Sequence, residues 1–353
     1  MNDNRIRFGI VGTGKITTWV LTAARQDERF QPLALMSRSR EHGEAFAREW
    51  GIERVYTTMD DLCQDADIDA VYIATPNATH HDMVMKAISL GKHVLCEKPM
   101  ASNSWEVEDM ITAARKKGVL LMEAMIATVN PNFLTLKENL PRLGVIRRYF
   151  ASYCQYSSRY DAFKQGNVAN AFKPELSNGS LMDIGVYTVY PMVALFGKPL
   201  QIHAEGVLLS TGVDGQGSAT FLYDGMNATV QFSKIANSYL PSEIEGEDGN
   251  IIMDSMQIIR SLQFCQRPQA NSGRGPKAVF EEIGRPLEKD EEYLSEIREF
   301  LDCLEAGRME SQLNRHDYSL WTAQVMEEMR RQMGIVYPSD NNFITSNHKT
   351  FVK

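Results

Sequence analysis

The feature that most constrains the fold is a short apolar run that ends in two closely spaced glycines. The pattern predicts a buried strand over residues 6–11 and a helix over residues 16–25, with the glycines between them. Gly12 permits a tight turn, Gly14 lets the backbone approach a pyrophosphate, and the helix start offers unpaired N–H groups to that anion. Thr17 stands where Gly or Ala is usual. The strand–turn–helix context predicts dinucleotide binding and disfavours an ordinary turn.

The first 125 residues alternate short apolar runs with longer amphipathic ones, which is the pattern of a parallel sheet with crossover helices. The predicted strands cover residues 6–11, 32–36, 70–74, 93–96 and 119–122. The predicted helices cover residues 16–25, 40–50, 79–90 and 104–117. We therefore expect an α/β domain with a doubly wound parallel sheet over residues 1–125, and we expect ligands at the carboxyl ends of its strands.

After residue 125 the pattern changes. Residues 147–156 form an aromatic-rich run, and strand patterns predominate from 200 to 262. Residues 221–230 predict a hairpin with Asp224 and Gly225 at the turn position that needs positive φ. The predicted helices cover 131–140, 180–196, 291–305 and 316–333, with a surface loop over 265–285. Consecutive hairpins indicate a mostly antiparallel sheet, so we expect an α+β domain over residues 126–353.

Composition excludes several classes of protein. With 43% hydrophobic residues, the 353-residue chain can form a large core, and its net charge of -8 argues against a nucleic-acid footprint. No apolar run approaches the ~20 residues of a membrane span, and no export signal precedes the first strand. The five cysteines lie far apart without a C-x-x-C motif, which indicates reduced thiols and no metal site. We therefore expect a cytoplasmic protein without nucleic-acid or membrane partners.

The end of the second predicted strand indicates which nucleotide is bound. NAD sites usually have Asp or Glu there, about 20 residues after the glycines, to hold the ribose hydroxyls. Here Ser37 and Arg38 occupy that place, and no carboxylate occurs before Glu41. Arginine pairs with phosphate through two N–H donors and stacks on adenine, which suits a 2′-phosphate. The residues favour NADP over NAD; the alternative is a solvated basic turn.

Another segment follows a predicted strand at the same edge of the sheet. Thr75, Pro76 and Asn77 end the strand over 70–74, and His80 and His81 begin the next helix. Adjacent histidines point in different directions on a helix, whereas a metal pair needs i, i+4 spacing. We expect these histidines to belong to the helix start, with one near the nicotinamide.

The motif E-K-P ends the next strand, at Glu97, Lys98 and Pro99. Lys98 lies where the reactive ring of a bound cofactor would be. A cis peptide bond before Pro99 would aim the lysine inward. The alternative is a surface lysine in a turn.

The second strong signal is D-x-G-x-Y, from Asp183 to Tyr187. Asn178 or Ser180 can cap the predicted helix, which places Asp183 and Tyr187 four residues apart on one face, and Gly185 leaves room for a ligand. A phenol moves a proton, a lysine ammonium lowers the pKa of that phenol, and a carboxylate orients a substrate. These groups suit alcohol and carbonyl chemistry at a nicotinamide, although an Asp/Tyr pair alone would usually be structural.

The joint pattern resembles the glucose–fructose oxidoreductase / inositol dehydrogenase / MocA (Gfo/Idh/MocA) family over nearly the whole chain. The matches are G-x-G at 12–14, E-K-P at 97–99 and D-x-G-x-Y at 183–187, in that order. The resemblance implies a Rossmann domain followed by an α+β domain whose open, mostly antiparallel sheet commonly mediates dimerisation. It implies Lys98, Asp183 and Tyr187 as catalytic residues. With Tyr rather than His at position 187, the chain resembles the branch of the family that contains the NADP-dependent aldose and dihydrodiol dehydrogenases.

One departure from the family pattern affects the substrate pocket. Many members have an Arg shortly before a Pro where this chain has Ala-Thr-Val-Asn-Pro at residues 127–131. Three residues that precede the Asp183 helix are expected to line the pocket instead: Arg159, Tyr160 and Phe172. The expected cofactor-binding residues are Gly12, Thr13, Gly14, Lys15, Ile16, Ser37, Arg38, Thr75, Pro76, Asn77, His80, Glu97 and Lys98.

These expectations combine into one leading hypothesis about activity. We expect an NADP-dependent oxidoreductase that transfers hydride at a hydroxyl or carbonyl carbon of a sugar or another cyclic polyol. The resemblance also implies a homodimer or homotetramer. Two alternatives stay open: a regulator that binds nucleotide without chemistry, and a nicotinamide-dependent glycosidase of the same fold.

Overall fold

A computed structural model describes residues 5–268 and 278–341. The chain divides into two compact units. Among the described residues, the first unit comprises 5–125, 289–323 and 339–341, and the second comprises 126–268, 278–288 and 324–338. We expected residues 289–323 in the second domain, but they pack with the first unit. The assignment of nucleotide and substrate roles to the two domains stays a prediction.

The first unit is built on a six-stranded sheet in the order β3-β2-β1-β4-β5-β6. Every neighbouring pair in this sheet is parallel, which confirms the doubly wound fold. The strands are β1 (Ile6–Val11), β2 (Phe30–Met36), β3 (Arg54–Tyr56), β4 (Ala70–Ile73), β5 (His93–Glu97) and β6 (Leu121–Ala124). The order reverses at β1, whose neighbours are β2 and β4, so the glycine turn after β1 lies at the point where such folds bind ligands.

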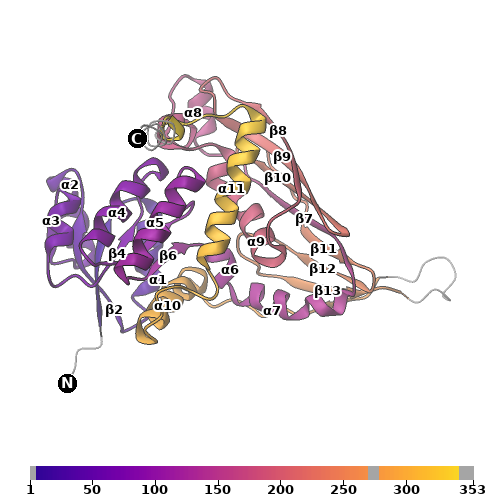
Figure 1. Cartoon of the computed structure of the whole chain (residues 1–353), viewed down its shortest axis with the longest axis horizontal. Coiled ribbons are helices and arrows are strands. Elements are labelled where there is room, and N and C mark those ends of the chain that lie inside the picture. Colours follow the sequence, from indigo (N-terminus) through magenta and orange to yellow (C-terminus); the bar gives the residue numbers. More distant parts are fainter. Residues whose placement is uncertain (1–4, 269–277, 342–353) are drawn as a thin grey trace, which may run out of the picture. The chain divides into compact units, whose positions relative to one another are not determined.

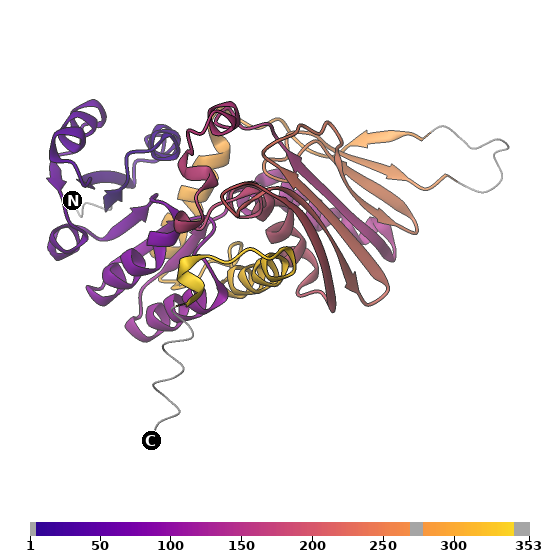
Figure 2. The same cartoon turned by 90° about the horizontal axis from the view of Figure 1, so that it is seen from above.

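Helices cover both faces of this sheet (Figures 1 and 2). They are α1 (Lys15–Ala24), α2 (Arg40–Trp50), α3 (Met59–Gln64), α4 (His80–Ser89), α5 (Ser104–Lys117) and α10 (Glu291–Glu305). One buried cluster joins the sheet to α3, α4 and α5, and a second joins it to α1, α2 and α10. Helix α10 belongs to this unit because Ile297, Phe300 and Leu301 are buried in the second cluster, with the rings of Phe8 and Phe300 5.7 Å apart.

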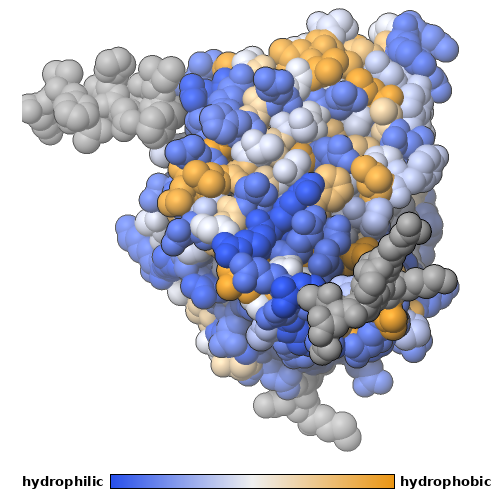
Figure 3. Space-filling view, turned by 90° about the vertical axis from the view of Figure 1, so that its right-hand side faces the viewer, coloured by the Kyte–Doolittle hydropathy of each residue, from blue (hydrophilic) through white to orange (hydrophobic). Residues whose placement is uncertain are grey.

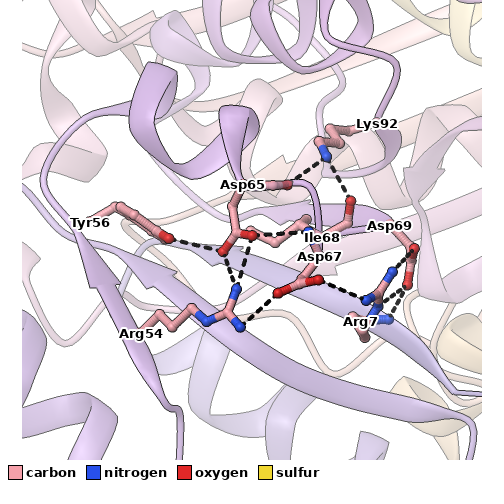
Figure 4. Close-up of polar contacts among 8 residues, drawn as sticks. All are labelled: Arg7, Arg54, Tyr56, Asp65, Asp67, Ile68, Asp69 and Lys92. Carbon is pink, nitrogen blue, oxygen red and sulfur yellow. Dashed lines mark hydrogen bonds and ion pairs between the residues drawn. The ribbon is translucent and has the colours of Figure 1, made fainter.

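A network of ion pairs and hydrogen bonds lies at the amino ends of the strands of this six-stranded sheet (Figure 4). Arg7 donates to both carboxylate oxygens of Asp69, at 2.8 and 2.9 Å. Arg54 binds both oxygens of Asp65, at 2.7 and 2.9 Å, and the ammonium of Lys92 donates to the carbonyl oxygens of Asp65 and Ile68. Each charge in this network thus has a partner from the same edge of the sheet.

The second unit is built on an eight-stranded sheet in the order β14-β13-β12-β11-β7-β10-β9-β8. All neighbouring pairs are antiparallel except β7 and β10, so the expected mostly antiparallel sheet is confirmed. The strands are β7 (Ile146–Cys154), β8 (Gln201–Leu208), β9 (Asp214–Tyr223), β10 (Met226–Ser233), β11 (Ser242–Gly246), β12 (Gly249–Met253), β13 (Leu262–Gln266) and β14 (Phe280–Glu282).

Two local predictions in this unit can be compared with the structure. The predicted hairpin is confirmed, because Tyr223 pairs with Met226 across the turn, where Gly225 has φ of 73°. The predicted loop over 265–285 is wrong at both of its ends, since β13 ends at Gln266 and the short strand β14 pairs with it. Residues 269–277 of that predicted loop lie outside the described residues.

Helix α9 (Val186–Phe196) packs on one face of this sheet (Figure 1), where the hydroxyl of the buried Tyr149 on β7 donates to the carbonyl of Thr188 at 2.9 Å. The remaining helices are α6 (Ile126–Val129), α7 (Pro131–Asn139), α8 (Tyr160–Lys164) and α11 (His316–Met333), and the division between the units falls within α11. The segment Pro174–Phe196 is apolar and long enough to span a membrane, but 83% of its most apolar window is buried, as in the core helix of a globular protein.

Candidate active site

The turn after β1 has the geometry of a phosphate cradle. Gly12 has φ of 111°, and a Cβ there would collide with the carbonyl oxygen of Ala74, so only glycine fits. Gly14 precedes α1 in extended conformation, no side chain caps the helix, and a Cβ at residue 14 would have no atom within 4 Å. The first turn of α1 has no acidic residue. The N–H groups at this end of α1 therefore face open space without a competing carboxylate, which fits a bound pyrophosphate.

The turn after β2 lies beside this cradle. Ser37 is buried at the end of β2, and its N–H donates to the carbonyl of Tyr56 at 3.0 Å. Arg38 and Arg40 are exposed, and Ser39 caps α2 by accepting a hydrogen bond from the N–H of His42. The ring of His42 reaches back to the hydroxyl of Thr13, at 3.0 Å. This contact joins the turn after β1 to the start of α2, and the exposed arginines lie beside the glycine turn.

His80 connects two of the predicted cofactor segments. It is fully buried, and burial lowers the pKa of its ring. Its Nε2 lies 2.9 Å from the carbonyl oxygen of Thr75, and its Nδ1 lies 3.0 Å from that of Pro99. The peptide bond between Lys98 and Pro99 is cis. Both ring nitrogens thus contact backbone oxygens, so the visible role of His80 is to link the turn after β4 to E-K-P.

Three buried carboxyl groups of the first unit interact with the charge of Lys98. Glu97 accepts hydrogen bonds from the Tyr72 hydroxyl at 2.7 Å and from the N–H of Lys98 at 3.3 Å. Glu123, on β6, accepts from the N–H of Met100 at 2.9 Å, and burial raises its pKa to about 7. Burial and the neighbouring Glu97 raise the pKa of Glu296, on α10, well above its usual value. In each case the charge of Lys98 opposes the rise.

Sequence reasoning found Glu97 but missed the other two carboxyl groups. Glu123 interrupts an apolar run, Leu121 to Met125, which is a signal that a search for buried charges could have used. Glu296 sits in an amphipathic helix among other charged residues, so its complete burial had no local signal.

In the second unit, Asp183 lies in a π-helical turn, Leu181–Gly185, that precedes α9. The predicted α-helix over 180–196 is therefore wrong over its first turn, and single π-turns are frequent at functional sites. Ser180, one of the two predicted caps, makes no side-chain capping bond, and the carboxylate of Asp214 accepts from the N–H of Leu181 at 2.6 Å. A carboxylate 33 residues away thus binds an N–H group at the start of this turn.

Tyr187 follows in the first turn of α9 and is buried, with its ring centroid 5.9 Å from that of Tyr153 on β7. Gly185 is needed between Asp183 and Tyr187 because a Cβ there would meet the ring of Phe232 at 2.9 Å. This close approach explains the glycine of the motif by packing of the turn against β10. The structure brings Asp183 and Tyr187 into one segment of the second unit, while Lys98 belongs to the first unit.

Sequence reasoning missed Lys234, which forms an ion pair with Asp183. The side chain of Lys234 is only 8% exposed and that of Asp183 is 34% exposed. The ammonium also lies 6.0 Å from the centroid of the Phe172 ring. Lys234 is 51 residues from Asp183 in the sequence and has no motif around it, so no local signal could have found it.

The three predicted pocket residues lie in the same unit but differ in their surroundings. Phe172 is fully buried and lies beside Lys234. The ring of Tyr160 lies 6.0 Å from that of Phe172. Arg159 is exposed at the start of α8. The substrate roles of all three stay predictions, and the structure connects only Phe172 with the Asp183 pair.

Comparison with known proteins agrees with the motifs. Residues 6–125 match the oxidoreductase family with an NAD-binding Rossmann fold, and residues 141–252 match the GFO/IDH/MocA C-terminal domain. The chain is 48% identical to scyllo-inositol 2-dehydrogenase (NADP(+)) of Bacillus subtilis (strain 168), over 95% of this chain and 99% of that protein. It is 32% identical to the trans-1,2-dihydrobenzene-1,2-diol dehydrogenase of Danio rerio, also over 95% and 99%.

Solved structures agree on the fold. A 3-ketoreductase from Actinomadura kijaniata, in complex with NADP and TDP-benzene, superimposes with a TM-score of 0.80 at 24% identity, covering 93% of this chain and 98% of that one. An aldose-aldose oxidoreductase from Caulobacter crescentus, complexed with glycerol, gives 0.76 at 23% identity, covering 93% and 97%. Together with the sequence relatives, these matches confirm the predicted resemblance: the chain belongs to the Gfo/Idh/MocA family of oxidoreductases.

Proposed function

We propose that this protein is an NADP-dependent oxidoreductase that transfers hydride at a hydroxyl or carbonyl carbon of a cyclic polyol or sugar. The observation that carries the proposal is the 48% identity, over nearly its whole length, to a scyllo-inositol 2-dehydrogenase (NADP(+)). The dihydrodiol dehydrogenases among the relatives act, by their names, on another ring compound with two neighbouring hydroxyls. A hydroxylated ring is the substrate class that both relatives share.

The residues of the first unit fit the cofactor. Gly12 and Gly14 leave the N–H groups at the start of α1 open to the pyrophosphate. Ser37, Arg38 and Arg40 offer hydroxyl and guanidinium donors for the 2′-phosphate, and no carboxylate lies among them to repel it. Thr75, Asn77 and Lys98 end the neighbouring strands and would lie along the rest of the nucleotide. When bound, NADP supplies the hydride acceptor or donor.

The roles that the family resemblance implies fall on Lys98, Asp183 and Tyr187. Tyr187 takes or returns the proton of the substrate hydroxyl at its phenolic oxygen. Lys98 holds the substrate oxygen and lowers the pKa of the phenol by its positive charge. Asp183 accepts a hydrogen bond from a hydroxyl of the ring and so fixes its orientation. Arg159, Tyr160 and Phe172 contribute to the wall of the pocket in this proposal.

The test is net turnover by the purified protein. We expect NADPH to accumulate when the protein is mixed with NADP+ and at least one of a panel of inositols, aldoses and trans-dihydrodiols. A nucleotide-binding regulator would give no turnover with any of them. A redox-neutral glycosidase would release sugar from a glycoside without a net change in NADPH. Either outcome would overturn the proposal.

We also propose that two copies of the chain pair through the sheet face opposite α9, in the cytoplasm. Along β7 and β12, this face presents the partly exposed apolar residues Phe150 and Ile252, and Arg148 forms an ion pair with Glu245 across it, at 3.5 Å. Figure 3 shows this side of the molecule, where small hydrophobic patches lie among hydrophilic residues.

All five cysteines are free, which suits a reducing compartment. A monomeric mass by light scattering at micromolar concentration would contradict the pairing.

A further inference from the structure

Lys234 is held more firmly than a surface lysine. It directly follows β10, its N–H donates to the carbonyl of Gly215 at 2.8 Å, and its carbonyl accepts from the N–H of Ser157 at 2.8 Å. Its ammonium pairs with the carboxylate of Asp183. Lysines are almost never this buried unless they are paired. Backbone and side chain thus fix the ammonium at one place beside the π-helical turn.

The ion pair is part of a longer row of buried charges. Asp214, the first residue of β9, is fully buried, and Lys234 and Arg330 both lower the pKa of its carboxyl. Burial has the larger effect and raises that pKa to about 6. Arg330, on α11, is also buried, with its guanidinium 4.3 Å from the centroid of the Tyr337 ring. Charges therefore alternate in sign from Asp183 through Lys234 and Asp214 to Arg330.

This row is tied to the backbone of the turn that carries Asp183. The carboxylate of Asp214 accepts from the N–H of Leu181, two residues before Asp183. Its other oxygen occupies the space that a Cβ at residue 179 would fill, and Gly179 has φ of 148°, which L side chains rarely adopt. The row therefore holds the Asp183 segment at both its backbone and its side chain.

We propose that Lys234 is a positioning residue for the reaction, which holds the Asp183 carboxylate ionised and in one orientation so that it accepts a hydrogen bond from a ring hydroxyl beside the reacting carbon. The inference rests on the proposed function. Asp183 is the member of the row that is partly exposed, and so the one that a substrate can reach. Asp214 and Arg330 are buried. The carboxylate of Asp214 opposes the positive charge of the lysine, and the guanidinium of Arg330 opposes the negative charge of Asp214.

The charged and aromatic groups around Lys234 bear on the ionisation of the Asp183 carboxyl group. The ammonium contacts Asp183 on the π-helical turn and lies 6.0 Å from the centroid of the Phe172 ring. Its charge also lowers the pKa of Asp214 on β9. Tyr187 and Tyr153 form the neighbouring aromatic pair. Lys234 is thus a cation in direct contact with the Asp183 carboxylate.

The first experiment measures the ionisation of Asp183 directly. In protein labelled with 13C at the aspartate carboxyl carbon, the Asp183 signal is assigned by its loss in Asp183→Asn and then titrated by NMR. A cation beside a carboxylate lowers its pKa by about 1–3 pH units, so Lys234→Met should raise the pKa of Asp183 by that amount. Lys234→Arg should restore it. Lys198→Met, which removes an exposed lysine bound to Gln324 in the same unit, should leave it unchanged.

The second experiment uses steady-state kinetics with a polyol and NADP+. In Lys234→Met we expect KM for the polyol to rise ~10-fold or more and the acid limb of kcat/KM to move toward neutral pH, with the KM for NADP+ unchanged. If Lys234→Met does not fold, Lys234→Gln, which keeps a hydrogen-bond donor without the charge, replaces it in both experiments. An unchanged Asp183 titration, or a loss of thermal stability with wild-type KM and pH profile, would overturn the inference. Absence of turnover in the wild type would count against the proposed function alone, because the NMR titration needs no substrate.

Discussion

The two edges of the six-stranded sheet treat polar groups in opposite ways. At the amino edge, Arg7 and Arg54 each bind carboxylates from the same edge, and the ammonium of Lys92 donates hydrogen bonds to two loop carbonyl oxygens (Figure 4). At the carboxyl edge, Gly12 and Gly14 keep side chains away from the helix start. Charged groups that are paired with neighbouring residues contribute to stability, whereas the N–H groups at the start of α1 are available to a ligand. The difference supports the proposal that the carboxyl edge binds the nucleotide.

The same edge also concentrates buried carboxyl groups. Glu97 is the last residue of β5 and Glu123 lies one residue before the end of β6, and burial raises the pKa of both carboxyl groups although the charge of Lys98 opposes the rise. At the amino edge, Asp65 and Asp69 are paired with arginines, and the pKa of each is lowered. Carboxyl pKa values are thus raised at one edge of the sheet and lowered at the other. Raised pKa values are typical of functional sites, and lowered ones are typical of structural ion pairs.

The largest expected effects are on the rate of the reaction, and they come from the predicted catalytic residues. Lys98→Met and Tyr187→Phe should each lower kcat by about 10²-fold to 10⁴-fold, which is the range for a positioned acid/base group. The affinity for NADP+ should change little in Tyr187→Phe, because the phenol acts on the substrate. Single-turnover kinetics and a fluorescence titration measure the two quantities. Near-full turnover in Tyr187→Phe with an inactive Lys98→Met would assign the proton transfer to another group.

The next effect concerns the nucleotide. Ser37→Asp should invert the cofactor preference, because a carboxylate beside the 2′-phosphate repels it and can hold the ribose hydroxyls of NAD. A hydrogen bond to a charged group contributes about 1.5–3 kcal/mol, so losing one or two of them should change the ratio of kcat/KM values by ~10²-fold. Arg38→Ala should have a smaller effect, since Arg40 is also exposed nearby. An unchanged ratio in Ser37→Asp would place the phosphate elsewhere.

A third prediction uses the buried carboxyl group on β6. Burial raises the pKa of Glu123 to about 7, so the folded state binds its proton more tightly than the unfolded chain does. The stability from this group is therefore present below about pH 4 and is lost as pH rises toward 7. Glu123→Gln should remove this loss and gain stability relative to wild type between pH 5 and 8, by about 1–3 kcal/mol. Parallel pH profiles in urea unfolding would contradict the assignment.

The smallest effect belongs to the amino edge. Arg7→Met should lower the free energy of unfolding by about 0.5–1 kcal/mol, the range for a partly exposed ion pair. Because Arg7 lies at the opposite edge from the glycine turn, kcat and both KM values should stay at wild-type levels. Urea unfolding and steady-state assays on the same preparation check this. A changed KM for NADP+ would break the distinction between the two edges.

How much of this could be predicted from sequence depends on whether the determinants are close along the chain. The glycine turn, the alternation of strands and helices, and the hairpin at Asp224–Gly225 are each encoded within about a dozen residues. The packing of α10 on the first sheet was not predictable, because Phe300 contacts Phe8 from 292 positions away. Strand β14 has three exposed residues and no apolar pattern, so its pairing with β13 had no local signal.

The candidate site divides in the same way. Gly12, Gly14, Lys98, Asp183 and Tyr187 lie in short motifs and were predicted from them. Lys234 and Asp214 act on the Asp183 turn from 51 and 33 residues away, and a single Lys or Asp at a strand end has no distinctive pattern. The π-helical turn was not predictable either, because the N–H of its first residue, Leu181, donates to the distant carboxylate of Asp214. Long-range partners that set local geometry are the part that only the structure reveals.

The most direct test of the central claim, that the carboxyl edge is a site for a nucleotide with a 2′-phosphate, is the comparison of the two cofactors on the wild-type protein. The measurement is kcat/KM for NADP+ and for NAD+ with a polyol such as scyllo-inositol, supported by the two Kd values from fluorescence quenching. The account predicts a preference for NADP+ of ~10²-fold or more, from two or three charge-assisted hydrogen bonds. Equal or better use of NAD+ would contradict it.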